Sequence, residues 1–88
     1  MMYRRIQRVH FVGIGGIGMC GIAELLHHQG VRVSGSDAKE GPTVARLRGL
    51  GVPVALGHAT EHVGDADCVV YSSAVRPGNP ELLEAERR

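Results

Sequence analysis

Three glycines near the N-terminus have the spacing that brings a peptide backbone against a phosphate group. Gly13, Gly15 and Gly18 form the pattern G-x-G-x-x-G, and an apolar run from Val9 to Val12 precedes them. In this pattern the first glycine permits a tight exit from a strand and the second has no Cβ to block a pyrophosphate. The third lets the following helix pack close to the sheet, and that helix directs unpaired N–H groups at the anion. The stretch therefore predicts a phosphate-binding turn between a strand and a helix.

An acidic residue follows at the separation typical of nucleotide sites. Asp37 lies nineteen positions after Gly18 and ends the next apolar segment. A carboxylate there can accept hydrogen bonds from ribose hydroxyls; the alternative is a turn aspartate ahead of Ala38 and Lys39. Ser36 offers a hydroxyl at the same strand end, where small residues leave room for a ring. These residues predict a sugar-binding position beside the phosphate turn.

Further polar residues follow the later predicted strands. Ser72 and Ser73 come directly after an apolar run, and His58 follows another. Since ligands of open α/β sheets bind across the carboxyl edge of the strands, all three are candidates for the same site. His58 can stack on a base or hydrogen-bond to it. The alternatives are an ordinary polar loop for the serines and a solvated surface histidine for His58.

No residue set indicates catalysis or metal binding. The chain has one lysine, Lys39, and lacks the G-x-x-x-x-G-K-[ST] pattern of an ATP-hydrolysing centre. Apart from His58, the histidines are expected to be solvated on helices or strand ends, and their spacing matches no zinc signature. We therefore expect no metal, no cofactor and no catalytic residue within this chain, which should bind and not catalyse. The histidines are His10, His27, His28, His58 and His62.

The length and composition are typical of one small globular domain. The 88 residues are 43% hydrophobic and 22% charged, with a formal net charge of +1. This balance favours no nucleic-acid partner. Solvated chain ends are expected for the basic residues Arg4, Arg5, Arg8, Arg87 and Arg88. No apolar run is long enough to cross a membrane. Cys20 and Cys68 fit two reduced, packed thiols. We expect a cytoplasmic protein.

Apolar patterning alternates between strand and helix periods. It predicts strands at 9–14, 31–37, 52–56 and 67–71, helices over 16–29, from Pro42 to 49–51 and from Pro80, and one helical turn at 60–63. The fold class is α/β: a Rossmann-like parallel sheet of four to five strands with helices on both faces, in one three-layer domain. Right-handed crossovers give the strand order 3-2-1-4.

Several elements carry specific expectations. Pro53 lacks an N–H, so the third strand should lie at the sheet edge. The fourth strand reads as covered on both faces, and a further strand beside it is expected to lie outside this sequence, which reads as a fragment. Gly30 is expected to follow the end of the first helix and Asn79 to cap the last. The apolar face of the first helix is expected to comprise Ile17, Ile22, Ala23, Leu25 and Leu26.

The strand count limits the size of the ligand. A complete dinucleotide fold has two βαβαβ halves, and this pattern contains one half and an additional strand. It therefore suits one nucleoside diphosphate with its appendage, and no part remains to hold a nicotinamide riboside. Two alternatives stay open: a regulatory module that binds NAD, and a piece of an NAD(P)-dependent oxidoreductase.

With these motifs placed, the sequence resembles the N-terminal domain of the Mur ligases of peptidoglycan synthesis. The resemblance implies that residues 1–88 are a UDP-sugar-binding domain whose partners are the central ATP-binding and C-terminal domains of a longer chain. It covers nearly the whole sequence in order. The matching segments are His10–Glu24, Gly35–Asp37, Gly57–His58, Ser72–Val75 and Asn79–Glu81.

The resemblance implies a ligand and an activity for the full-length protein. The ligand is UDP-N-acetylmuramic acid, and the activity is an ATP- and Mg²⁺-dependent ligation of L-alanine to it. A relative that recycles a murein tripeptide shares G-S-D and N-P but lacks S-S-A, and is the alternative. The implied phosphate-binding residues are Gly13, Gly15, Gly16, Ile17 and Gly18, and the implied uridine-binding residues are Ser36, Asp37, His58, Ser72 and Ser73.

Overall fold

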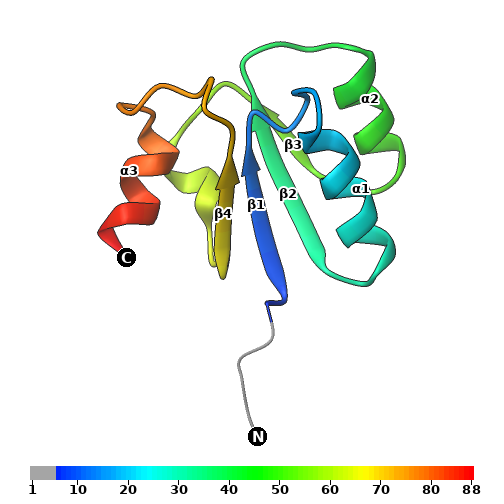
Figure 1. Cartoon of the computed structure of the whole chain (residues 1–88), viewed down its shortest axis with the longest axis horizontal. Helices are drawn as coiled ribbons and strands as arrows, with labels where there is room; N and C mark the ends of the chain where they lie inside the picture. Colours follow the sequence, from blue (N-terminus) through cyan, green and yellow to red (C-terminus); the bar gives the residue numbers. More distant parts are fainter. Residues whose placement is uncertain (1–5) are drawn as a thin grey trace, which may run out of the picture.

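Strands and helices alternate along the chain, as the patterning predicts. The computed structural model describes residues 6–88, so Arg4 and Arg5 lie outside it. Figure 1 shows the arrangement. The elements are β1 (Arg8–Val12), α1 (Met19–His28), β2 (Arg32–Asp37), α2 (Pro42–Gly49), β3 (Val54–Leu56), the 3-10 turn η1 (Thr60–Val63), β4 (Cys68–Tyr71) and α3 (Pro80–Arg87).

The strands form one parallel sheet in the order β3-β2-β1-β4, which confirms the predicted topology. Helices α1 and α2 lie on one side of the sheet, and α3 with η1 lies on the other (Figure 1). This is the expected three-layer arrangement. As expected, β3 is an edge strand; the carbonyl of Pro53, just before it, accepts a hydrogen bond from Gly35 N at 3.0 Å.

The core is aliphatic and centres on β1. Phe11, Val12 and Ile14 are fully buried, and Leu47 of α2 is 1% exposed. Burial of such side chains stabilises the fold by about 1.5–3 kcal/mol each. The core positions β1 between β2 and β4, so the turn after β1 lies at the middle of the sheet's carboxyl edge.

Helix α1 differs from the prediction in its start and in its apolar face. It begins at Met19, because Gly18 has φ +85° and stands before the helix in the left-handed region. Strand β1 likewise ends at Val12, since Gly13 has φ +76°. The predicted apolar face is wrong at three positions: Ile17 precedes the helix and is fully exposed, and Ile22 and Leu25 are half exposed. The side chains that pack inward are Met19, Cys20, Ala23 and Leu26.

Strand β4 is less covered than its apolar sequence predicts. Cys68, Val69 and Val70 are half-buried, and Tyr71 is 56% exposed. The reason is its place at a sheet edge, and no further strand beside it is found among residues 6–88. Cys20 and Cys68 are both free thiols packed against the core, as expected. Within the described residues no helix has the length and apolarity to cross a bilayer.

The ends of the helices lie at the residues that the sequence predicts. Gly30 has φ +88° directly after α1, and Pro42 begins α2. The side chain of Asn79 accepts a hydrogen bond from the N–H of Glu81 at 2.8 Å, which confirms it as the cap of α3. This cap matters for the site because it sets where the first turn of α3 meets the sheet.

Candidate functional site

A cleft of about 810 Å³ lies at the carboxyl edge of the sheet. Its volume is within the range of small-molecule sites, and its position is the one where open α/β sheets bind ligands. Segment 74–79, after β4, forms one wall. The structure thus brings together residues from four separate segments. The sequence-predicted residues that line the cleft are Gly13, Gly15, Gly16, Asp37, His58 and Ser72.

The other predicted residues do not line this cleft. Ile17 and Gly18 are exposed at the start of α1, and Ser73 lines a separate groove between β4 and α3. Ser36 is fully buried, and its hydroxyl donates to Glu81 Oε1 at 2.7 Å. The expectation that Ser36 offers a free hydroxyl at the strand end is therefore wrong, because the buried carboxylate already takes that donor.

The glycine turn is held by backbone hydrogen bonds to β2. The amides of Gly13 and Ile14 donate to the carbonyl of Ser36 at 2.8 and 3.0 Å, and Gly16 N donates to Gly13 O at 3.0 Å. Gly15 N donates to the carboxylate of Asp37 at 2.8 Å. For the amides of Ile17 and Gly18 no acceptor is found within residues 6–88. Of the five residues implied to hold the phosphates, Gly13, Gly15 and Gly16 therefore have engaged N–H groups. The N–H groups of Ile17 and Gly18 are open.

The glycine that permits close packing is not the predicted one. A Cβ on Gly18 would meet no atom within 4 Å, so its role is the left-handed backbone and not helix packing. A Cβ on Gly35 would lie 2.5 Å from Ile14 Cδ1. Gly35 therefore lets β2 accept the side chain of Ile14, which lies within the turn. The small residues Ser34–Ser36 within a strand were the sequence signal for this contact.

Asp37 combines the two interpretations of its sequence position. Its Oδ2 accepts from Gly15 N at 2.8 Å, and its Oδ1 accepts from Lys39 N at 3.2 Å. The second contact is the turn role that was the alternative. The first brings a negative charge onto the phosphate turn itself. Asp37 also lines the cleft, which is compatible with the predicted contact to a ribose. That contact stays a prediction.

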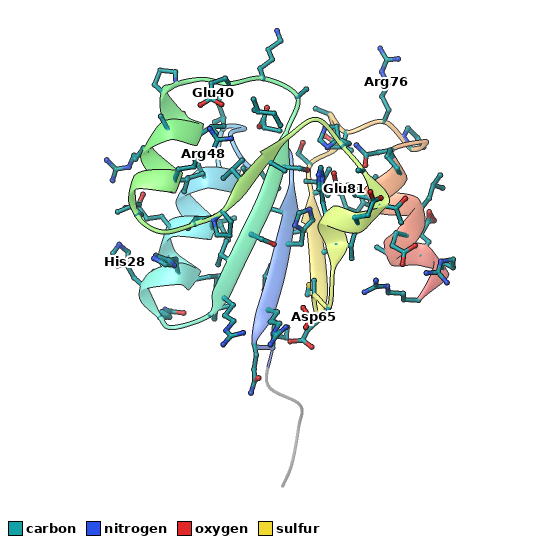
Figure 2. All side chains as sticks on the ribbon, turned by 180° about the vertical axis from the view of Figure 1, so that it is seen from behind. His28, Glu40, Arg48, Asp65, Arg76 and Glu81 are labelled. Carbon is teal, nitrogen blue, oxygen red and sulfur yellow. The ribbon has the colours of Figure 1, made fainter. Side chains whose placement is uncertain are left out.

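A buried carboxylate beside the cleft was missed by the sequence reasoning. Glu81, in the first turn of α3, is fully buried (Figure 2). His10 is also buried, at 1% exposure, so the expectation that it is solvated is wrong. The donors to Glu81 are His10 Nε2 at 2.6 Å, Ser36 Oγ at 2.7 Å, His58 Nδ1 at 3.1 Å, Ala59 N at 3.1 Å and His62 Nδ1 at 3.0 Å.

Hydrogen bonds determine the charge of this carboxylate. Burial alone would raise the pKa of Glu81, but hydrogen bonds from Ser36, His10 and His62 outweigh it and lower the pKa to about 2. Glu81 is therefore ionised at neutral pH and acts only as an acceptor. The histidine nitrogens that face it must then carry protons. Among residues 6–88 no cluster of side chains suited to a metal ion is found.

Two of the remaining histidines are not freely solvated either. His62 is a quarter exposed and bonded to Glu81, and His27 Nε2 donates to the carbonyl of Leu50 at 2.8 Å. His28 is exposed, as expected. Of the five histidines, His58 is the one that lines the cleft, with 23% of its side chain exposed.

Arg76 is a second residue that the sequence reasoning missed. It lies on the loop after β4, is exposed, and lines the cleft. In Figure 2 its side chain projects from the loop at the carboxyl edge of the sheet. Its guanidinium supplies the positive charge of the lining, which suits a phosphate group. The run of loop residues from Ser72 to Asn79 was the only sequence signal.

The parallel sheet, the glycine turn after β1 and the cleft over the carboxyl edge define a Rossmann-like α/β domain. A model of the Mur ligase family, described as its catalytic domain, matches residues 8–88. The chain belongs to the Mur ligase family.

Its relatives include proteins named UDP-N-acetylmuramate–L-alanine ligase. The one from Sulfurihydrogenibium is 56% identical over 98% of this chain and 19% of its own length. The one from Bdellovibrio bacteriovorus is 62% identical over 92% of this chain and 18% of its own length. The chain thus spans about a fifth of the curated relatives it matches.

Solved structures agree with the sequence relatives. UDP-N-acetylmuramate–alanine ligase from Thermotoga maritima has a TM-score of 0.87 and 41% identity, over 91% of this chain and 19% of that one. A murein peptide ligase from Psychrobacter arcticus has a TM-score of 0.80 and 30% identity, over 92% of this chain and 17% of that one. Both contain the fold described above.

Proposed function

We propose that this chain is the N-terminal domain of a UDP-N-acetylmuramate–L-alanine ligase and binds the UDP part of that substrate. The observation that carries the proposal is the convergence of the glycine turn, Asp37, His58 and Ser72 on one cleft. These residues come from separate segments, and the cleft that they line has the volume of a small-molecule site. The proposed ligand is UDP-N-acetylmuramic acid.

The two ends of the proposed ligand have different surroundings. The open amides of Ile17 and Gly18 lie at the end of the glycine turn, outside the cleft lining, and Arg76 in the lining adds a positive charge. These groups suit the pyrophosphate, with Gly13, Gly15 and Gly16 forming the surface beneath it. Asp37 and His58 supply polar atoms for the ribose and the uracil. Ser72 also lines the cleft.

The full-length protein is proposed to use ATP and Mg²⁺ in forming the amide bond to L-alanine. In keeping with the family, we assign ATP and Mg²⁺ to the central domain of the longer protein, and no catalytic residue to this chain. A cytoplasmic location stays a prediction.

The murein tripeptide ligase is the alternative within the family. The higher identity to the alanine-adding structure, 41% against 30%, favours the first proposal. The dinucleotide alternatives are disfavoured by the match of residues 8–88 to the Mur ligase family.

A titration followed by amide resonances tests the proposal. UDP, UDP-N-acetylmuramate, NAD and ATP are added separately to the labelled 88-residue chain. We expect the two UDP compounds to shift the resonances of Gly15–Gly18, Asp37 and Ser72, and NAD to shift them less. A stronger response to NAD than to UDP would contradict the proposal and support a dinucleotide site.

A further inference from the structure

The imidazole of His58 connects the buried carboxylate of Glu81 to the cleft. Its Nδ1 lies 3.1 Å from Glu81 Oε2 and 3.0 Å from Ser36 Oγ. The ring also lines the cleft, with 23% of the side chain exposed. One edge of the imidazole is therefore tied to the protein interior, while the ring borders the space where a ligand would lie.

The hydrogen bonds on Nδ1 determine which nitrogen carries the proton. An ionised carboxylate only accepts, so a hydrogen bond to Glu81 requires a proton on Nδ1. The hydroxyl of Ser36 donates to the same carboxylate, and its oxygen is left to accept from Nδ1 as well. In the neutral ring Nε2 is then unprotonated. It is a hydrogen-bond acceptor on the side away from Glu81.

The carboxylate of Glu81 is held in place by several contacts, so it can fix the tautomer of His58. Asn79 caps α3 and places Glu81 in the first helical turn. Four segments around the carboxylate each supply at least one group that faces it, and none of these groups is a second carboxylate. They are His10 from β1, Ser36 from β2, His58 and Ala59 from the segment after β3, and His62 from η1.

We propose that Glu81 is a positioning residue that holds His58 as its Nδ1–H tautomer, so that Nε2 accepts the N3–H of a uracil base. Uracil presents a donor at N3, whereas cytosine presents an acceptor there. An unprotonated Nε2 therefore attracts the first base and repels the second. This inference rests on the proposed UDP site and adds to it a means of selecting the base.

The tautomer is tested first in the unliganded chain. At a pH of about 8, above the ordinary pKa of histidine, ¹⁵N NMR should give His58 a pyrrole-type Nδ1 and a pyridine-type Nε2. Glu81→Gln should mix or reverse the two signals, because a carboxamide can donate as well as accept. Glu84→Gln is the matched control: Glu84 lies in the same helix and bonds to Arg87 and Arg88 instead. A pyridine-type Nδ1 in the wild-type chain would overturn the proposal.

Base selection is tested by comparing UDP with CDP. We expect the wild-type chain to bind UDP about tenfold more tightly, the effect of one hydrogen bond gained against one lost. Both His58→Ala and Glu81→Gln should bring the two affinities together. Adding Glu81→Gln to His58→Ala should change the UDP-to-CDP ratio no further, since Glu81 acts through His58. Equal loss of both affinities in Glu81→Gln would instead show a purely structural role.

The two sets of measurements separate the possible failures. If the wild-type chain binds neither UDP nor UDP-N-acetylmuramate, the proposed function fails and the base selection fails with it. If UDP binds but CDP binds equally well, the proposed function stands and the role of Glu81 in selection is wrong. The wild-type spectrum needs no variant, so the tautomer is decided even if Glu81→Gln does not fold.

Discussion

The carboxylate of Asp37 accepts a hydrogen bond from the backbone N–H of Gly15 at 2.8 Å. One residue ends β2 and the other lies in the turn after β1, so the contact joins the two central strands at their carboxyl ends. It also places a negative charge on the turn proposed to hold a diphosphate. Any anion bound there must share the turn with Asp37 or displace it.

Removing the charge of Asp37 should change the affinities for pyrophosphate and for UDP in opposite directions. Asp37→Asn should raise the affinity for inorganic pyrophosphate by about threefold, because a like charge is removed. It should lower the affinity for UDP by about tenfold, since a charged acceptor for the ribose is lost. Calorimetric titration measures both. Asp65→Asn, which removes an equal charge from an exposed pair with Arg8, should change neither, and a drop in both affinities would contradict this assignment.

A side chain at Gly15 should close the phosphate position while the fold remains. A Cβ there would lie 2.9 Å from Asp37 Oδ2 and 3.4 Å from Val44 Cγ2. Gly15→Val should therefore abolish UDP binding with a loss of stability of about 1–3 kcal/mol. Gly21→Ala, where a Cβ meets no atom within 4 Å, is the control and should bind normally. Retained affinity in Gly15→Val would place the ligand elsewhere.

Gly35 should be intolerant of even one methyl group. Its Cβ would lie 2.5 Å from Ile14 Cδ1 and 2.7 Å from Ile14 Cβ, inside the core. We expect Gly35→Ala to destabilise the domain by about 1–3 kcal/mol, as overpacking does. Gly49→Ala in α2 has open space and should stabilise by up to about 1 kcal/mol. Urea denaturation compares the two, and a Gly35→Ala variant as stable as the wild type would refute the packing argument.

Arg76 should contribute electrostatically to nucleotide binding. Removing its charge with Arg76→Gln should weaken UDP binding by about threefold to tenfold at low salt and reduce the dependence of affinity on ionic strength. Arg46→Gln is a suitable control, because Arg46 of α2 pairs with Glu24 of α1 and does not line the cleft. Titrations at low and high salt measure the effect. An unchanged salt dependence in Arg76→Gln would exclude contact with the phosphates.

Stability should fall in acid through Glu81. Its pKa is lowered from 4.5 to about 2 in the folded chain. A depressed folded pKa gives stability that is present above the unfolded value and is lost as the pH falls from about 4.5 toward 2. The shift corresponds to about 3 kcal/mol. Urea denaturation between pH 6 and 2 should show this slope, and Glu81→Gln should flatten it. A wild-type chain equally stable across that range would contradict the assignment.

Much of the fold was predictable because its signals are local. The glycine turn, the Asn79–Pro80 helix start and the alternation of strand and helix periods each occupy a few consecutive residues. Right-handed crossovers then convert that alternation into one strand order, which the structure confirms. The family resemblance rested on the same short segments and is likewise confirmed. Six of the ten predicted site residues line one cleft for the same reason, since strand ends share an edge.

Contacts between distant segments decided the remainder. His10 and Glu81 are 71 positions apart, and no local pattern shows that they meet in the interior. Whether Ser36 faces a ligand or a carboxylate, and whether Gly18 or Gly35 permits close packing, depends on what another segment places beside it. Periodicity describes one face of one element. Only the packed sheet determines which side chains share that face, which amides stay open and which histidine borders the cleft.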